Sequence, residues 1–118
     1  MSFVPTRDLA VAGAFYGELL GLPLLTRTSL AHVYDVSGGR LCLVRADNVE
    51  PTGETAFALS VIDLPASVAR LRKRGVQLID YPGLDQDGDG AWTSPGGALV
   101  VWFNDPDGHI VSLIQVPD

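Results

Sequence analysis

Two histidines and one cysteine are the side chains of this 118-residue chain whose chemistry depends most on their neighbours. His32 alternates with Leu30 and Tyr34 in a β-like stretch, so that the three would share one face of a strand. If that face lines a cavity, His32 can act as an acid–base or donate a hydrogen bond to a ligand. The sequence favours the simpler alternative, a structural histidine bonded to a neighbouring strand or to water.

Cys42 lies in an apolar β-like run, and we interpret it as a small buried residue. It could act as a nucleophile only if His32 on the neighbouring strand served as its base. His109 follows an Asp-Pro-Asp-Gly sequence that begins at Asp105 and predicts a tight turn between two strands. We therefore expect the His109 side chain to satisfy local backbone groups rather than to act in catalysis.

Aromatic residues are the more promising features for a binding site. Four of them fall on or beside predicted strands: Tyr34, Phe57, Trp92 and Trp102. Trp102 alternates with Val100 and Asn104, and Trp92 would form a rim or lid in the loop before that strand. Core packing is the simpler interpretation of each. Together, stacked aromatics in an acidic surround suit a flat or cationic organic ligand.

The acidic segment 85–90 matches the opening of an EF-hand calcium loop, Asp-x-Asp-x-Asp-Gly. The twelfth position of such a loop carries a bidentate glutamate, and here it is Gly96. The flanking sequences indicate strands rather than two helices. We interpret the segment as an acidic, solvated loop.

Composition narrows the function classes. The net charge of −6 argues against nucleic acid, which requires clustered Lys and Arg. The basic cluster 70–74 falls at the end of a predicted helix, where cations are favoured. No apolar run reaches the length of a membrane span, and residues 1–5 lack the pattern of a secretory signal. A lone cysteine excludes an intrachain disulfide and suits a cytoplasmic location.

An internal repeat organises the chain. Asp8 and Asp63 each precede a leucine, follow a β-like stretch and open an amphipathic segment, which ends at Gly21 or Gly75. An aspartate can cap the first turn of a helix, and a glycine can end it in the left-handed conformation. The shared helical faces are predicted to hold Ala12, Phe15, Tyr16 and Leu19 in the first helix, and Leu64, Val68 and Leu71 in the second.

Strand-like segments surround both helices. In the first half they cover 2–4, 22–26, 31–36 and 41–45, and in the second half 55–61, 77–81, 98–103 and 109–116. Each half therefore reads strand–helix–strand–strand–strand. We expect one domain over 1–118, with a first module at about 1–50 and a second at about 54–118. Neither half could bury its sheet alone, so the two must share an interior.

These motifs resemble the vicinal oxygen chelate superfamily, which includes glyoxalase I, bleomycin-resistance proteins and extradiol dioxygenases. The resemblance rests on the helix that carries Asp8-Leu9, Phe15-Tyr16 and Leu20-Gly21-Leu22, on Arg74-Gly75-Val76, and on the hairpin 98–113. It implies an α+β fold of two βαβββ modules that form a U-shaped, partly closed sheet around a cavity. It also implies a homodimer.

The resemblance implies four positions for a divalent metal, one on the first and one on the last strand of each module. They correspond to Met1, Ala56, Ser112 and, depending on register, Cys42, Val44 or Arg45. Alanine, methionine and serine replace the imidazole and carboxylate ligands that such a cation prefers. The sequence therefore predicts no metal and no cofactor at this place.

We thus expect a cytoplasmic, metal-independent, glyoxalase- or bleomycin-resistance-like homodimer that binds a small organic ligand and neither nucleic acid nor membrane. The residues expected to bind the ligand are His32, Tyr34, Trp92, Trp102 and Ser112. No catalytic residue stands out, and whether the protein is an enzyme stays open. The alternative is a metal-dependent glyoxalase-, lyase- or dioxygenase-type enzyme of the same superfamily, with ligands drawn from a shifted register that uses His32 and Asp35. A third class is a structural dimer with a filled interior.

Overall fold

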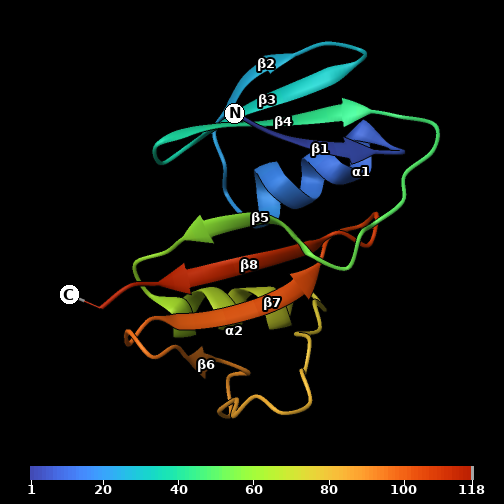
Figure 1. The fold of residues 1–118 in the computed structure, drawn as a ribbon. Helices are drawn as coiled ribbons and strands as arrows, with labels where there is room; N and C mark the ends of the chain where they lie inside the picture. The colour runs from blue at the N-terminus through green and yellow to red at the C-terminus, as the bar shows by residue number, and fades with distance from the viewer. Residues whose placement is uncertain (118) are drawn as a thin grey trace.

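The computed structural model describes residues 1–117 and contains two four-stranded sheets, each with one helical segment packed against it (Figure 1). Along the chain the elements are β1 (Ser2–Thr6), α1 (Leu9–Gly13), the π-helical η1 (Ala14–Leu19), β2 (Leu24–Arg27), β3 (Ala31–Val36), β4 (Gly39–Arg45), β5 (Thr55–Ser60), α2 (Leu64–Lys73), β6 (Trp92–Thr93), β7 (Leu99–Asn104) and β8 (Ile110–Gln115).

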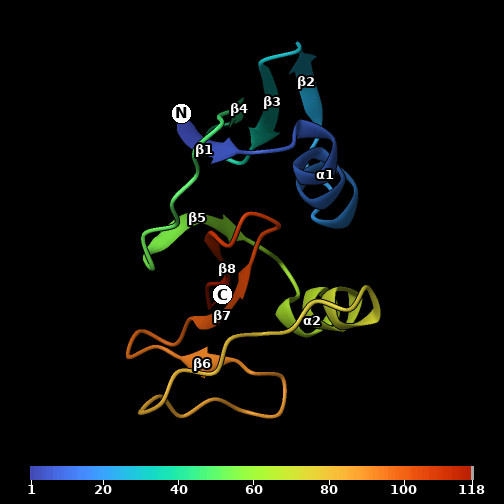
Figure 2. The ribbon, with the colours of Figure 1, turned by 90° about the vertical axis from the view of Figure 1, so that its right-hand side faces the viewer.

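The two sheets have the same topology. Sheet A has the order β1-β4-β3-β2 and sheet B the order β5-β8-β7-β6. In each, the first strand of the module pairs in parallel with the last, and the other neighbours are antiparallel. Figure 2 shows the two sheets one above the other with their strands in this order. The predicted α+β fold of two βαβββ modules is confirmed, and neither sheet closes into a barrel within the described chain.

Both helices begin and end as the sequence predicts. The Asp8 carboxylate accepts hydrogen bonds from the Ala10 and Val11 N–H groups, and that of Asp63 accepts from the Ala66 N–H. These bonds satisfy donors that have no partner within the first turn of a helix. Gly21 and Gly75 take φ values of 75° and 83°, which other residues adopt only with strain.

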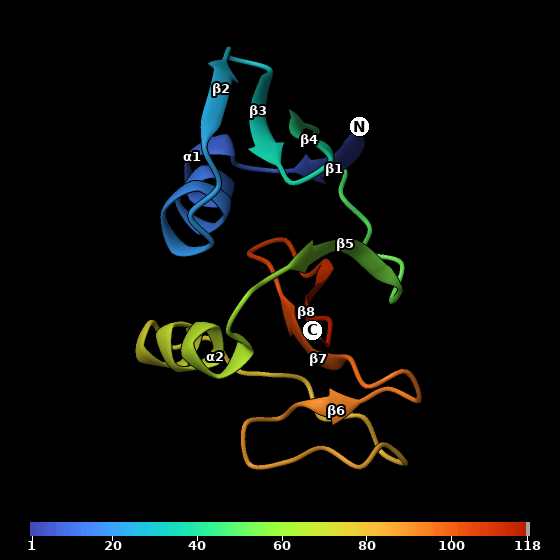
Figure 3. The same ribbon diagram turned by 90° about the vertical axis from the view of Figure 1, so that its left-hand side faces the viewer.

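The core lies between each helix and its sheet. The residues predicted to share the two helical faces are all buried, at 9% exposure or less. On the sheets they meet the alternating positions Leu41 and Leu43 of β4 and Val101 and Phe103 of β7. Figure 3 shows both helices on the same side of the molecule. Each sheet thus has a helix side, which is packed, and an open face.

The first helix changes its hydrogen-bonding pattern after Gly13. The predicted amphipathic segment is α-helical to that residue and then π-helical, and the Leu20 N–H bonds to the Phe15 carbonyl five residues back. The wider turn leaves Phe15, Tyr16 and Leu19 on the buried side. The predicted face is therefore correct, although the helix is not uniform.

The predicted strand 77–81 is wrong. Within the described chain this segment forms one isolated bridge, between Leu78 and Phe103, and the first strand after α2 is instead the two-residue β6. The side chain of Gln86 explains why no ladder forms. Its amide bonds to the Tyr81 N–H at 2.8 Å and to the carbonyls of Ile79 and Gly90, so it satisfies backbone groups that a partner strand would otherwise take.

No helix within residues 1–117 is both long and apolar enough to cross a lipid bilayer.

Candidate functional site

The structure places the five expected ligand-binding residues on two different surfaces. Trp92, Trp102 and Ser112 belong to the open face of sheet B, whereas His32 and Tyr34 belong to the helix side of sheet A. The register decides this, because directly paired residues of neighbouring strands share a face. Trp102 pairs with Ser112, next to the buried Val101–Leu113 pair that faces α2. His32 and Tyr34 pair with Leu43 and Leu41 of the core.

An aromatic cluster covers part of the open face of sheet B. The Trp92 and Trp102 rings lie 6.2 Å apart between centroids, at an interplanar angle of 34°. Tyr81 stands edge-on against Trp102, with 5.1 Å between centroids and an angle of 88°. All three side chains are only partly buried. We call Tyr81, Trp92 and Trp102 the aromatic cluster.

Ser112 lies beneath this cluster and is 3% exposed. It pairs with Trp102 on one side and with Ala58 of β5 on the other. The sequence did not single out Tyr81 as a site residue, because its place beside Trp102 depends on the loop conformation that Gln86 holds. Phe57, also considered for the cavity, is instead a core residue of the helix side and contacts Tyr16 edge-on.

A groove of about 500 Å³ lies between the first helix and strands β2 and β3. We call it the helix-side groove. It is lined by Leu9, Ala10, Gly13, Ala14, Gly17, Glu18, Leu22, Leu24, Arg27, His32 and Tyr34. The sequence singled out His32 and Tyr34 but missed the two helical glycines and Arg27, although the four-residue spacing of the glycines places them on one helix face.

His32 and Tyr34 pack closely against the glycines. A Cβ placed on Gly13 would lie 3.2 Å from both His32 Nδ1 and the Tyr34 hydroxyl, and one on Gly17 would lie 3.3 Å from the Tyr34 ring. His32 Nδ1 is shielded from solvent and has no hydrogen-bond partner within residues 1–117. Burial and then the charge of Arg27 lower the pKa of His32 below 6.5, so the ring is neutral at neutral pH. No group of a neighbouring strand within residues 1–117 bonds to this nitrogen, and the alternative bond to water stays a prediction.

Neither the nucleophile–base pair of Cys42 and His32 nor the metal-ligand pair of His32 and Asp35 is possible in this fold. Cys42 pairs with Val33 and so points to the opposite face of sheet A from His32. Asp35, an odd number of residues from His32, also points to that opposite face and is exposed. Cys42 is buried at 6% exposure, as the sequence predicts.

The positions that correspond to the metal ligands of the superfamily do not fit a divalent cation. Met1 and Ala56 are exposed and offer no hard donor, and Ser112 stands where a carboxylate is usual. Within residues 1–117, no three His, Cys, Asp or Glu side chains lie close enough together to hold an ion. In the acidic loop, the Asp87 carboxylate bonds instead to the N–H groups of Asp89 and Ala91.

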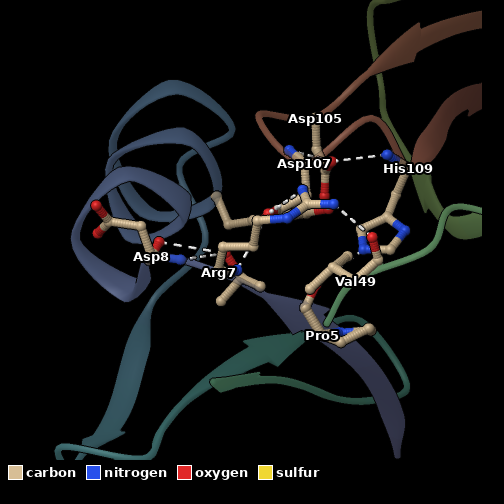
Figure 4. Close-up of polar contacts among 9 residues, drawn as sticks. Pro5, Arg7, Asp8, Val49, Asp105, Asp107 and His109 are labelled. Carbon is tan, nitrogen blue, oxygen red and sulfur yellow. Dashed lines mark hydrogen bonds and ion pairs between the residues drawn. The ribbon is translucent and has the colours of Figure 1, made fainter. Parts of the chain in front are cut away.

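The turn that begins at Asp105 joins the two modules (Figure 4). Arg7 bonds to the Asp107 carboxylate and to the Val49 carbonyl. The His109 ring bonds through Nε2 to the Pro5 carbonyl at 2.8 Å, which is 104 residues away in the chain. The expectation that the His109 side chain serves only local backbone groups is therefore wrong.

Asp105 is the centre of this junction and is 6% exposed. Its carboxylate accepts hydrogen bonds from the Tyr16 hydroxyl at 2.7 Å and from the N–H groups of Asp107 and His109. Burial and then the Asp105 charge raise the pKa of Tyr16 far above its ordinary value, so the phenol stays protonated as a donor. The junction is a satisfied structural network.

Comparison with known proteins supports the fold. A bleomycin resistance determinant encoded on transposon Tn5 superposes with a TM-score of 0.72 at 21% identity, covering 99% of this chain and 96% of that chain. Lactoylglutathione lyase from Agrobacterium tumefaciens gives 0.72 at 18% identity, covering 97% and 90%. TnmS3, an antibiotic binding protein from Streptomyces sp. CB03234, gives 0.71 at 28% identity, covering 98% and 92%.

No curated protein matches the sequence significantly. The model of one protein family, however, matches residues 2–113, which is nearly the whole chain. This match agrees with the duplicated strand–helix–strand–strand–strand topology and with the solved structures above. The chain therefore belongs to the Glyoxalase/Bleomycin resistance protein/Dioxygenase superfamily.

Proposed function

We propose that this protein binds a small, flat organic molecule on the open face of sheet B, without the help of a metal. The aromatic cluster and the underlying Ser112 would form the site. The observation that carries the proposal is the arrangement of Tyr81, Trp92 and Trp102. They stand within 6.2 Å of one another between neighbouring ring centroids and remain partly exposed.

The exposed area of the aromatic cluster favours the binding of a ligand to this surface. Aromatic side chains have a large apolar area, so their exposure to water costs more free energy than that of most residues. Partly exposed indole rings also offer a surface on which a flat ligand can stack. Indole faces also attract cations. The net charge of −6 favours a cationic ligand further, because it raises the local concentration of positive solutes.

The descriptions of two structural neighbours support the binding of a small molecule, but they do not identify one ligand for this chain. TnmS3 is described as an antibiotic binding protein, and the Tn5 protein as a bleomycin resistance determinant. We extend antibiotic binding to this chain as part of the proposal.

A second copy of the chain would cover the site, and we propose a homodimer in the cytoplasm. Sheet A also has an open face, where Phe3 is 66% exposed beside Cys42. An apolar face of this kind is costly to leave in water. Sedimentation equilibrium tests the dimer directly, and a monomer at micromolar concentration would contradict it.

Isothermal titration with doxorubicin, a flat cationic polycycle, and with bleomycin tests the binding proposal. We expect at least one to bind, and Trp102→Ala to weaken that affinity about tenfold through lost stacking. Ile62→Ala is the matched control, because Ile62 is a large apolar residue that is 97% exposed and outside the site. Equal affinities of Trp102→Ala and the unmodified protein would remove the aromatic cluster from the site.

The alternative is a metal-dependent enzyme, as the lactoylglutathione lyase among the structural neighbours illustrates. The residues at the usual ligand positions disfavour it. Elemental analysis of protein purified without chelator distinguishes the two: stoichiometric zinc, nickel, iron or manganese would support the enzyme and contradict our proposal.

A further inference from the structure

We propose that the helix-side groove is a second ligand site, which takes a small carboxylic acid with an apolar body. It lies between the first helix and sheet A, on the helix side, whereas the aromatic cluster lies on the open face of sheet B. The inference therefore does not rest on the proposed function. A volume of about 500 Å³ is within the range of pockets that hold small molecules.

The floor of the groove holds one buried polar atom that the described protein leaves without a partner. His32 is 9% exposed and its Nδ1 has no hydrogen-bond partner within residues 1–117, and the Tyr34 hydroxyl converges with it beside Gly13. Buried polar groups are almost always hydrogen-bonded, because an unmet bond costs about 1–3 kcal/mol. A ligand atom would remove that cost.

The absence of a side chain at Gly13 lets both groups lie against the first helix and converge at one point. Its backbone has φ −63° and ψ −39°, an ordinary helical conformation that does not require glycine. A larger residue would instead crowd its neighbours, since its Cβ would lie 3.2 Å from both His32 Nδ1 and the Tyr34 hydroxyl. Glycine here makes room for the two side chains, whose polar atoms converge beside it.

The charges and donors around this point favour an anion. Arg27 pairs with His32 across the β2–β3 ladder and forms no ion pair with any residue in 1–117. The guanidinium and the Tyr34 hydroxyl are donors, and the neutral imidazole carries one N–H. The guanidinium and the hydroxyl match a carboxylate, to which the imidazole adds a third donor in its Nδ1–H tautomer, and arginine holds that group in a bidentate fork.

The remaining walls determine the body of the ligand. They consist of the apolar residues Leu9, Ala10, Ala14, Leu22 and Leu24. Glu18, the one acidic group in the lining, is exposed on the helix. An apolar body therefore fits the walls, with its carboxylate directed to the floor and away from Glu18.

Titration with 2-naphthoate, followed by ¹H–¹⁵N NMR of the intact protein, tests the site. We expect shifts at Gly13, Gly17 and Arg27, and an upward shift in the pKa of His32 as the anion binds beside it. The uncharged 2-naphthamide should bind at least about tenfold more weakly, because it cannot form the charged pair. The indole signals of Trp92 and Trp102 report the other site in the same spectra.

Two variants test the residues. Gly13→Ala should weaken binding about tenfold, because its Cβ would displace the His32 and Tyr34 side chains that it meets at 3.2 Å, and its thermal midpoint is recorded as the folding control. Arg27→Gln should abolish the preference for naphthoate over naphthamide. Arg45→Gln is the matched control, an exposed strand arginine whose partner is Asp47.

Several results would overturn the inference. They are the absence of binding at millimolar naphthoate, equal binding of the amide, shifts confined to the two indoles, or unchanged affinity of Gly13→Ala. None of them would affect the aromatic cluster, whose test uses different ligands and a different variant.

Discussion

Two regions of this molecule each contain a buried histidine and a buried tyrosine, but the hydrogen bonding of these side chains differs between the regions. At the junction between the modules, Tyr16 bonds to Asp105 and the His109 ring bonds to the Pro5 carbonyl. In the helix-side groove, where Tyr34 lies beside His32, the buried Nδ1 of His32 has no partner within the described chain. Both tyrosines are at most 2% exposed. Residue type and burial alone therefore do not distinguish a structural side chain from one that is free to bind a ligand. The hydrogen bonds that each side chain forms within the protein make this distinction.

The largest effect is expected at the junction. Asp105→Ala removes the acceptor for Tyr16, Asp107 and His109, and should lower the free energy of unfolding by about 3 kcal/mol. Urea denaturation measures this. Asp85→Ala, in the exposed acidic loop, is the control and should stay within about 0.5 kcal/mol of the unmodified protein. A loss below that control level for Asp105→Ala would show that the network is not structural.

Removal of one hydroxyl from each pair compares the two regions directly. Tyr16→Phe should cost about 1.5 kcal/mol, because it removes the hydroxyl donor to Asp105 Oδ2, while Oδ1 keeps the N–H groups of Asp107 and His109. Tyr34→Phe should cost about 0.5 kcal/mol or less, since its hydroxyl gives up no protein bond. The same urea experiment applies. Equal costs would contradict the distinction between a satisfied junction and a vacant groove.

The smallest effect concerns pH. Because burial and Arg27 lower the pKa of His32, the unfolded chain takes up a proton near pH 6.5 before the folded state does. The unfolded state then binds more protons, so stability should decrease as the pH falls below about 6.5. Arg27, Glu18 and Tyr34 are the other charged or titratable residues that line the groove, and burial raises the pKa of Tyr34, so its phenol stays protonated over this pH range.

Thermal denaturation of the unmodified protein and of His32→Gln between pH 7.5 and 5.5 measures this dependence. The variant should lose less stability over that interval. Parallel curves for the two proteins would show that His32 contributes no such linkage.

Local features of the fold could be predicted because they depend on neighbouring residues. Asp8 and Asp63 cap their helices through bonds to N–H groups two or three residues away, and Gly21 and Gly75 end them by their own backbone freedom. Strand β3 has the predicted bounds, because alternation and the following turn define both ends.

Which face of a strand meets a helix could not be predicted in the same way. The segment 41–44 reads Leu-Cys-Leu-Val, and an unbroken apolar run gives no alternation from which to choose a side. Because His32 and Tyr34 pair with residues of β4, the sequence could not show which face of the sheet they occupy either. The position of Tyr81 and the failure of the predicted strand 77–81 depend on Gln86, whose long-range bonds leave no periodic signal.

The most direct test of the proposed function is the effect of doxorubicin and bleomycin on the two indole N–H signals in a ¹H–¹⁵N NMR titration. If the aromatic cluster is the site, the bound molecule should shift the signals of both Trp92 and Trp102 in proportion to occupancy and leave His32 unchanged. Binding that leaves both indoles unmoved would contradict the account.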